Sequence, residues 1–394
     1  MPLTIRMASA TAVPGVVVDQ DDTDLARTTI RRVSLRLLPF LFLLFVCNYI
    51  DRTNVSIAAL QMNRDLRFSA STYGLGTGIF FVGYLLFEVP SNLILARVGA
   101  RRWIARFMIA VPLAGAIGNP ISAWLLGLDG WYGLAGWQWV FLLEGLPSVL
   151  IGFTVLAILT DRPSHARWLS ETQREWLVAR LQRDGDESSA PHGVPPLSAL
   201  AHPIVLLSSL LYFLAMTSHY GYLFWAPTIV RDELHASSAA VGVITGGLAC
   251  CAAGVMLVVG SSSDRTGERF FHAAACLALA ALGYVGAALL GDPVTRVASL
   301  ALVPAGIYGF LAPFWCLPSA ILRGAAAAAG IAFVNSFGNL GGVVGLYALG
   351  VLKDATGSTT GALLGLAMMA LAAGVLCVVL RRQAAFAFRD RASS

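Results

Sequence analysis

The amino-acid sequence predicts an all-α membrane protein with ten transmembrane helices, four in a first bundle and six in a second. Three observations lead to this fold class. Of the 394 residues, 57% are hydrophobic and 12% are charged, and the mean hydropathy is +0.72. The apolar residues form ten long runs, and the basic residues gather between only some of these runs. Because a soluble domain has about 25% charged residues, this composition excludes a soluble enzyme, a disordered chain and a nucleic-acid-binding protein.

Each of the ten apolar runs is long enough to cross a bilayer, since about 20 residues of helix span the hydrocarbon core. Lipid offers the backbone no hydrogen-bond partner, so such runs are expected to form helices. The runs lie near residues 37–60, 72–95, 103–127, 138–160, 203–228, 237–260, 270–290, 297–320, 327–351 and 359–380.

The basic residues predict the orientation of these helices. Of the 27 lysine and arginine residues, 21 fall on the side that holds both termini, and Arg52 lies inside the first run. The positive-inside rule therefore places both termini in the cytoplasm of a bacterial inner membrane, and it explains the basic charge without a nucleic-acid partner. The five basic residues on the opposite side are Arg64, Arg67, Arg231, Arg296 and Lys353.

The polar segments divide the chain into five parts. We expect a disordered cytoplasmic tail at 1–30, a four-helix bundle at 31–160, a linker at 161–202, a six-helix bundle at 203–380 and a tail at 381–394. Within the linker, Ser170 and Gln173 have the spacing of a capping box, which predicts the start of an amphipathic helix on the membrane surface.

No enzyme or metal motif accompanies the apolar runs. The sequence has no Walker loop, no H-E-x-x-H and no G-x-S-x-G. Its six cysteines all lie in apolar runs without a C-x-x-C spacing, so neither a disulfide nor a zinc site is expected. We therefore expect no enzymatic activity, no cofactor and no bound metal.

Two short basic loops resemble each other and lie after the second run of each bundle. Either loop alone is also explained as a basic turn with a glycine bend, but two copies at one topological position favour an internal repeat. Both contain the pattern R-x-G-x-R, and we predict that both act as cytoplasmic gating loops. Their residues are Arg97, Gly99 and Arg101 in the first copy, and Gly260, Asp264, Arg265, Gly267 and Arg269 in the second.

The second loop closely resembles the G-x-x-x-D-R-x-G-x-R motif of the major facilitator superfamily. Four further segments look like the anion:cation symporter family within it, which is similar to bacterial tartrate, hexuronate, glucarate, galactonate and phthalate carriers. The resemblance covers about residues 31–382. The segments are Asn48–Asn54, Gly83–Asn92, Phe224–Thr228 and Asn335–Gly342.

The resemblance implies two bundles of six helices, whereas this chain has ten apolar runs. From Arg265 to Leu380 there are 115 residues with four runs, but from Arg97 to Thr160 there are 63 residues with two. The difference of 52 residues corresponds to about two spans with their loops. We place the shortage between Arg106 and Val111. The family's fourth span, with an arginine and a glutamate implied in binding and proton coupling, falls in this gap.

Charged residues inside the first bundle are the first candidates for a transport site. An intramembrane charge usually faces a cavity or a partner, because it is costly in lipid. Asn48, Asp51 and Arg52 lie on one helical stripe, and the resemblance implies that Asp51 exchanges a proton and Arg52 holds a substrate carboxylate. A structural ion pair with other helices is the alternative. Tyr84 and Glu88 form a similar stripe on the second run. Glu88 is a candidate for a second proton site, and the alternative is a hydrogen-bonded contact between helices.

Polar residues of the second bundle are candidates for substrate contacts. His219 has a side chain suited to proton coupling, and its alternative is a buried polar group near the pore. Asn335 and Asn339 share a helix face, and the alternative for them is hydrogen bonding between helices. For Glu144, near two tryptophans at the outer face, we favour a structural role. The second-bundle candidates are His219, Tyr220, Tyr308, Trp315, Asn335 and Asn339.

Together these features predict a monomeric proton symporter of small organic or sugar-acid anions, working by alternating access in the lipid bilayer. Its partners are a small carboxylate substrate and a coupling ion, H⁺ or Na⁺. The alternative is a transport-inactive deletion derivative of such a carrier.

Overall fold

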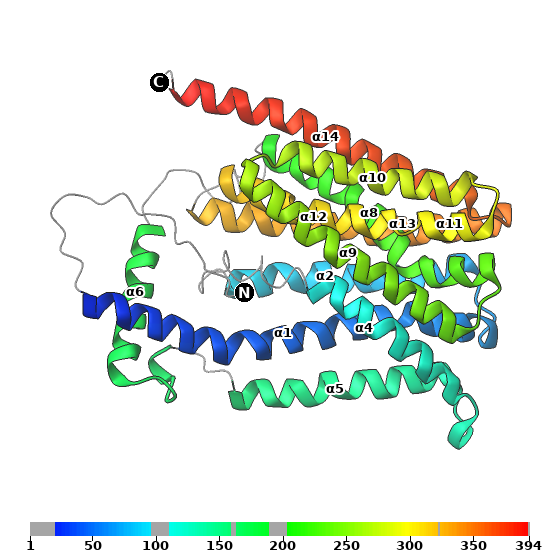
Figure 1. The fold of residues 1–394 in the computed structure, drawn as a ribbon, viewed down its shortest axis with the longest axis horizontal. Helices are drawn as coiled ribbons and strands as arrows, with labels where there is room; N and C mark the ends of the chain where they lie inside the picture. Colours follow the sequence, from blue (N-terminus) through cyan, green and yellow to red (C-terminus); the bar gives the residue numbers. More distant parts are fainter. Residues whose placement is uncertain (1–19, 96–109, 159–162, 189–202, 322–323, 393–394) are drawn as a thin grey trace. The chain divides into compact units, whose positions relative to one another are not determined.

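The computed structural model describes residues 20–95, 110–158, 163–188, 203–321 and 324–392, and within these ranges every regular element is a helix (Figure 1). Apolar side chains can lie on all sides of a helix in lipid. This explains why polar and apolar residues seldom alternate in the sequence. The helices are α1 (Gln20–Asp65), α2 (Ala70–Leu95), α4 (Ala110–Leu125), α5 (Gly136–Ile158), α6 (Glu171–Ser188), α8 (Pro203–Leu234), α9 (Ser238–Thr266), α10 (Phe270–Leu289), α11 (Pro293–Ser299), α12 (Leu302–Ile321), α13 (Gly324–Thr356) and α14 (Thr360–Ala392), with short 3-10 turns η1 (Leu126–Leu128), η2 (Trp131–Gly133) and η3 (Pro163–His165).

The prediction of an all-α membrane protein is confirmed for the described residues. Every predicted apolar run carries a helix, and α11 and α12 together cover the run at 297–320. Within the described residues, seven helices are long and apolar enough to cross a membrane by length and composition. The other three predicted spans are α2, α4 and α5, and α4 is described only from Ala110 onward.

The first helix begins earlier than the sequence analysis predicted. Because α1 starts at Gln20, the expectation of a disordered tail through residue 30 is wrong for residues 20–30. Three aspartates stand near this helix start, where acidic side chains interact favourably with the helix dipole. No proline or glycine interrupts the helix before Pro39. The second predicted tail is likewise helical up to Ala392.

The chain divides into two compact units, and the first combines residues up to Leu41 with residues 155–187. It contains α6, whose start confirms the predicted capping box. The amide N–H of Gln173 donates to Ser170 Oγ at 3.3 Å, and the amide N–H of Ser170 donates back to Gln173 Oε1 at 3.3 Å. In the same unit, the Arg36 guanidinium lies 5.2 Å from the ring centre of Trp168.

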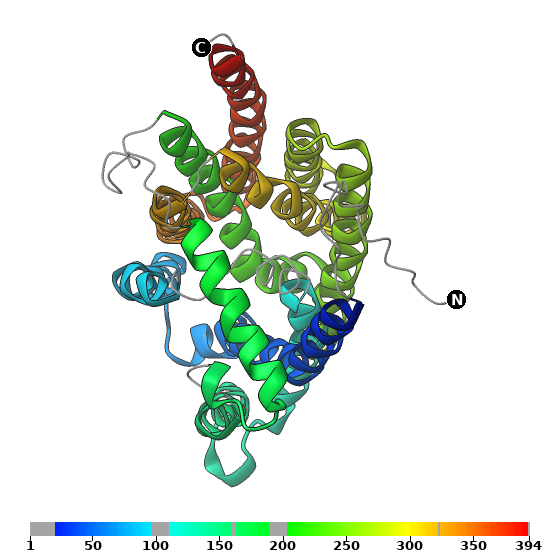
Figure 2. The same ribbon diagram turned by 90° about the vertical axis from the view of Figure 1, so that its left-hand side faces the viewer.

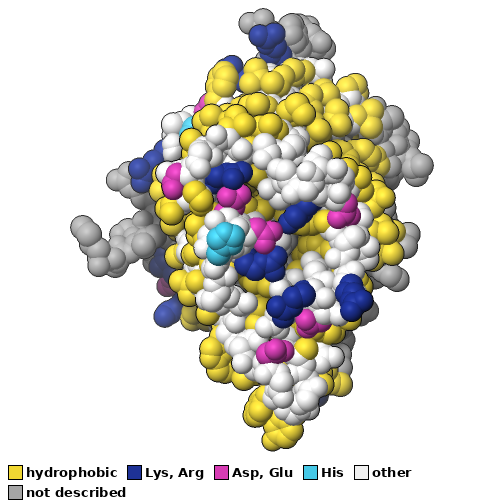
Figure 3. Space-filling view, turned by 90° about the vertical axis from the view of Figure 1, so that its right-hand side faces the viewer, with side chains coloured by type: hydrophobic (Ala, Val, Ile, Leu, Met, Phe, Trp, Pro, Cys, Tyr) yellow, Lys and Arg dark blue, Asp and Glu magenta, His cyan; other side chains and the backbone are white. Residues whose placement is uncertain are grey.

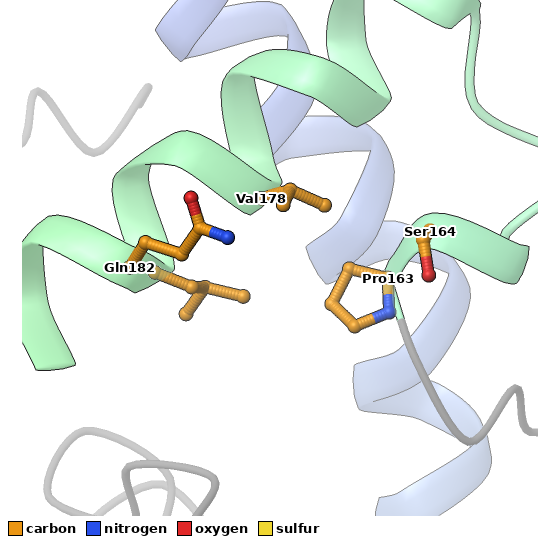
Figure 4. A pocket seen from close by; sticks show the side chains of 5 residues that line it. Pro163, Ser164, Val178 and Gln182 are labelled. Carbon is orange, nitrogen blue, oxygen red and sulfur yellow. The ribbon is translucent and has the colours of Figure 1, made fainter.

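A shallow hollow lies in this first unit between η3 and α6. Figure 4 shows Pro163 and Ser164 on one side of it, and Val178 and Gln182 on the other. Its lining is mostly apolar and contains none of the predicted transport residues.

The second unit contains residues Phe42–Thr154 and 188–394, so most of the first predicted bundle and all of the second belong to it. Its main helix pairs are α2 with α13, α13 with α8, α10 with α14 and α12, and α4 with α9. Figure 2 looks along many of these helices and shows α2 beside α13. The pairs α2–α13 and α4–α9 each join the first predicted bundle to the second.

Glycines allow the closest of these helix pairs to form. A Cβ on Gly74 of α2 would overlap the carbonyl oxygen of Leu346 in α13, and a Cβ on Gly78 would lie 3.3 Å from Val343 Cα. On another face of α13, a Cβ on Gly341 would lie 2.6 Å from Thr217 Oγ1 of α8. Small residues four apart therefore let these helices approach through their backbones, as is common in membranes.

Candidate functional site

Arg52 forms the centre of a hydrogen-bonded chain that joins the two predicted bundles. Its Nη2 donates to the Tyr220 hydroxyl at 3.0 Å, and that hydroxyl donates to Asn339 Oδ1 at 2.8 Å. The three side chains come from α1, α8 and α13. Arg52 is half-buried, whereas Tyr220 and Asn339 are buried. Three residues singled out from the sequence are thus brought together by helices far apart in the chain.

Aromatic rings surround the Arg52 guanidinium. Its central carbon lies 5.0 Å from the ring centre of Phe81, 5.1 Å from that of Phe80 and 5.3 Å from that of Tyr220. A cation is attracted to ring faces at such distances, and more strongly where water is excluded. The rings therefore help to hold the guanidinium in place.

A second group of polar side chains lies beside these hydrogen-bonded residues. The hydroxyls of Tyr49 and Tyr308 lie 3.3 Å apart, and both residues are buried. The His219 ring centre is 5.1 Å from that of Tyr220 and 5.3 Å from that of Tyr308. His219 is only 4% exposed, and its Nδ1 has no hydrogen-bond partner among the described residues. Such a buried, unsatisfied nitrogen is suited to a ligand or a water molecule.

Tyr49 was not predicted as a site residue, although its spacing in the sequence was a signal. Tyr49 lies three residues before Arg52, and residues at this spacing share a helix face. The predicted stripe instead combined Asn48 and Asp51 with Arg52. The structure separates them, because Asn48 and Asp51 are exposed while Arg52 packs among rings.

Two carboxylates lie in a separate cluster. Glu144 of α5 is buried, and its Oε1 accepts a hydrogen bond from Ser122 Oγ of α4 at 2.6 Å. Asp51 lies near the same segment, since a Cβ on Gly145 would be 3.9 Å from Asp51 Oδ1. Asp51 and Asn54 are both close enough to interact with Glu144. The sequence analysis discounted Glu144 for its position near two tryptophans and missed this neighbourhood.

The remaining intramembrane candidates lie outside these two clusters or outside the described side chains. Trp315 is half-buried, and its ring centre lies 5.0 Å from that of Tyr212 and 5.2 Å from that of Phe314, within an aromatic cluster. Asn335 is half-buried on α13, one turn before Asn339. Tyr84 and Glu88 lie on α2, where the side chains fall outside the described part.

The second predicted gating loop has a well-defined geometry at the end of α9. Gly267 follows the helix with a φ of 68°, a left-handed conformation that favours glycine. Arg269 Nη1 lies 2.6 Å from Asp264 Oδ1 and donates to Ser263 Oγ at 3.2 Å. Arg265 is exposed, and Gly260 packs near Ala312. The first loop, with Arg97, Gly99 and Arg101, lies outside the described residues.

Glu268 caps the next helix in this loop. Its carboxylate accepts hydrogen bonds from the amide N–H groups of Phe271 at 2.8 Å and His272 at 3.1 Å. Partial burial alone would raise the pKa of Glu268, but these hydrogen bonds and the His272 side chain lower it overall. The loop is therefore anchored to α10 by a carboxylate that stays ionised to lower pH than usual.

Charged residues gather at the opposite helix ends of the second unit. Figure 3 shows acidic and basic side chains in the middle of this end, with apolar side chains around them. Asp232 lies 2.9 Å from Arg231 Nη2 and 3.1 Å from Lys353 Nζ. Arg296 Nη1 lies 2.9 Å from Glu233 Oε2. These contacts include three of the five basic residues that the sequence analysis placed on the non-cytoplasmic side.

Two contacts at this end connect the two predicted bundles. Arg231 of α8 donates to the carbonyl oxygen of Leu60 in α1 at 2.9 Å. Asp354 of α13 accepts hydrogen bonds from the first amide N–H groups of α2, those of Ala70 and Ser71. These contacts therefore join the two predicted bundles at this end of the second unit.

Comparisons with known proteins agree with the resemblance found in the sequence. The family model described as Major Facilitator Superfamily matches residues 102–346. A protein named "Putative tartrate transporter" from Agrobacterium vitis is 38% identical, with 92% of this chain and 97% of that protein covered. A "Quinolone resistance transporter" from Acinetobacter baumannii is 34% identical, covering 88% and 94%. The "Inner membrane transport protein RhmT" of Escherichia coli is 29% identical, covering 91% and 96%.

The same alignments measure how short the chain is. The alignment with the Agrobacterium vitis protein runs over 422 residues, although 92% of this 394-residue chain is only about 362 residues. About 60 aligned positions therefore have no counterpart here, and the alignment with RhmT, 420 residues over 91% of the chain, has a similar shortfall. This length is sufficient for two membrane-spanning helices and their loops.

Solved structures agree on the fold. The crystal structure of a bacterial homolog to the human lysosomal transporter Spinster, in an inward-facing and unoccupied conformation, matches with a TM-score of 0.62 at 17% identity. The match covers 87% of this chain and 94% of that one.

Proposed function

Because the chain belongs to the Major Facilitator Superfamily, we propose that it is a proton symporter that carries small organic or sugar-acid anions by alternating access. The family consists of membrane transporters and not of enzymes. The apolar helices of this chain agree with a multi-pass membrane protein. The proposal adds a substrate class, small acid anions, a coupling ion, H⁺, and a mechanism, alternating access.

The proposal is carried by one observation, the hydrogen bonds that link Arg52, Tyr220 and Asn339. A guanidinium offers donors in a planar fork that fits a carboxylate, and it stays charged at any physiological pH. A phenol and an amide beside it can pair with substrate hydroxyls. Since the three side chains come from both bundles, a substrate bound there would contact both, as alternating access requires.

The neighbouring aromatic and histidine side chains extend this site. His219 and Tyr308 lie next to Tyr220, and His219 Nδ1 has no partner among the described residues. A second polar group of the substrate, such as the far carboxyl or a hydroxyl of a dicarboxylic sugar acid, could accept or donate there. The relatives named as tartrate transporters support a substrate of this size.

The proposed orientation puts both termini in the cytoplasm of a bacterial inner membrane. The basic residues support it, because 21 of the 27 lysine and arginine residues lie on the side of the termini and only five on the side of Arg231, Arg296 and Lys353. The contacts of Asp354 with α2 and of Arg231 with Leu60 would close that outer end. In this arrangement the substrate site would open toward the cytoplasm.

The alternative of a transport-inactive derivative gains no support. The chain is short by about two helices, but the Arg52 cluster does not depend on them. Its described members lie on α1, α8, α12 and α13, and all of these helices are present.

Uptake into proteoliposomes tests the proposal. Purified protein is reconstituted, and uptake of radiolabelled tartrate, glucarate, galactonate and a fluoroquinolone is measured under an imposed pH gradient or Na⁺ gradient. We expect acid uptake driven by the pH gradient, and its loss in Arg52→Gln. Arg64→Gln is the matched control, since the Arg64 side chain is 79% exposed. Uptake of only the fluoroquinolone, or no gradient-driven uptake of any acid by protein that elutes as a single species, would overturn the proposal.

A further inference from the structure

Four polar side chains form a cluster apart from Arg52. Glu144 of α5, Ser122 of α4 and Asn54 of α1 are buried, with exposed fractions of 7%, 2% and 3%. Asp51 of α1 is exposed and lies near Gly145. The cluster thus combines an inner carboxyl group with an outer one.

The Ser122 hydroxyl can serve Glu144 in either protonation state. Its oxygen lies 2.6 Å from Glu144 Oε1 and 3.0 Å from the carbonyl oxygen of Gly118. A hydroxyl has one hydrogen, so it can donate to only one of these two oxygens at a time. When it donates to Glu144, it stabilises the carboxylate. When it turns to Gly118, its lone pairs can accept the hydrogen of a protonated Glu144.

The other oxygen of Glu144 is less well compensated, although the Asn54 amide lies nearby. Glu144 Oε2 is buried and has no hydrogen-bond partner among the described residues. A buried carboxylate without a cation or enough donors is costly, and a second carboxylate nearby adds repulsion. A proton on Glu144 removes both costs while Asp51 stays ionised toward the more exposed side.

Among the described residues, Asp51 is the charged group that acts on Glu144. Glu144 is the only ionisable residue of α5, and the described part of α4 contains none. On α1, Arg52 follows Asp51 in sequence, and its guanidinium donates to Tyr220 of α8.

We propose that Glu144 and Asp51 share one exchangeable proton, with Ser122 as the hydrogen-bonding partner of Glu144, and that this proton is the coupling ion. The inference rests on the proposed function. On release, the O–H bond of Glu144 breaks, the proton passes to the Asp51 carboxylate and then to water, and Ser122 turns its hydrogen from Gly118 to Glu144. On loading, these steps reverse. Glu144 then substitutes for a carboxyl group on the absent helices.

Infrared difference spectroscopy tests the shared proton directly, without transport. Protein in lipid is titrated from acid to alkaline pH, and the C=O band of a protonated carboxyl group is followed. We expect a band that is lost in Glu144→Gln and shifted in frequency in Ser122→Ala, because the hydroxyl contact is removed. Asp65→Asn, at the exposed end of α1, is the control and should leave the band unchanged. A wild-type protein without the band, or a band that persists in Glu144→Gln, overturns the inference even if the protein transports acids.

Transport assays give the second readout. In Glu144→Gln, we expect loss of uptake driven by a pH gradient, with counterflow of labelled against unlabelled substrate retained, because counterflow needs no net proton movement. Gradient-driven accumulation equal to the wild type in this variant would contradict the coupling role. If the wild type transports no acid, the proposed function fails, but the infrared band still decides whether the pair holds a proton.

Discussion

Asp354, near the end of α13, holds the first turn of α2 through Ser71. Its Oδ2 accepts the amide N–H of Ser71 at 2.8 Å, and its Oδ1 accepts that of Ala70 at 2.9 Å. The first amide N–H groups of a helix have no partner within the helix, so a carboxylate supplied by another helix satisfies them and also favours the helix dipole. In this chain the capping residue comes from the other bundle. The cap therefore joins the two predicted bundles at this end of the molecule.

Replacement of Asp354 should loosen this contact. In Asp354→Ala, the N–H groups of Ala70 and Ser71 lose their acceptor, so we expect faster hydrogen exchange in the first turn of α2. Asp354→Asn should have a smaller effect, because an amide oxygen can still cap a helix. Hydrogen-exchange mass spectrometry of the peptide that begins α2 measures this. Equal protection in all three proteins would show that the contact does not hold the two bundles together.

The same cap predicts a dependence on pH. The Ser71 side chain and amide N–H, together with the amide N–H of Ala70, lower the pKa of Asp354 below its ordinary value of 3.8. The carboxylate is therefore favoured while this contact is formed, and its contribution is fully present above pH 3.8 and is lost as pH falls through the lowered pKa. The ratio of exchange rates between the wild type and Asp354→Ala should stay constant from neutral pH to about 5 and approach one in stronger acid. A ratio that already falls near neutral pH would contradict this assignment.

The sequence was sufficient for the fold because membrane insertion depends on summed hydropathy along a run. Each apolar run predicted one spanning element, and small errors in a boundary do not change that sum. The start of α1 was missed because residues 20–30 are polar, and polarity alone does not separate a disordered tail from a helix with acidic residues in its first turns.

The site was only partly predictable. Arg52, Tyr220 and Asn339 were identified separately, because a polar residue inside an apolar run is costly without a partner. Their connection depends on how α1, α8 and α13 pack, which one sequence does not specify. Glu144 was discounted because it lies near two tryptophans, and its hydrogen bond with Ser122 of α4 is a tertiary contact that one sequence does not specify.

The close approach of α2 to α13 provides a test of helix packing near the contact of Asp354 with α2. A Cβ on Gly74 would overlap the backbone of Leu346, so Gly74→Ala forces the two helices apart. Overpacking of this kind usually costs about 1–3 kcal/mol. We expect a lower melting temperature in detergent and slower uptake. Gly76→Ala on the same helix is the control, because a Cβ there meets nothing within 4 Å. If both variants behave like the wild type, α2 and α13 do not pack as closely as described.

The Tyr220 hydroxyl provides the most direct test of the proposed substrate site. Tyr220→Phe keeps the ring beside the guanidinium but removes the hydroxyl between Arg52 and Asn339. A hydrogen bond to a charged group contributes about 1.5–3 kcal/mol, so affinity for the substrate should fall about 10- to 100-fold if the hydroxyl orients Arg52 for the carboxylate. Isothermal titration with the transported acid measures this. Tyr347→Phe on α13 is the control, since Tyr347 is 46% exposed and lies apart from the cluster. Unchanged affinity in Tyr220→Phe would mean that the substrate binds Arg52 without this chain, and the site would then have to be sought nearer to His219 and Tyr308.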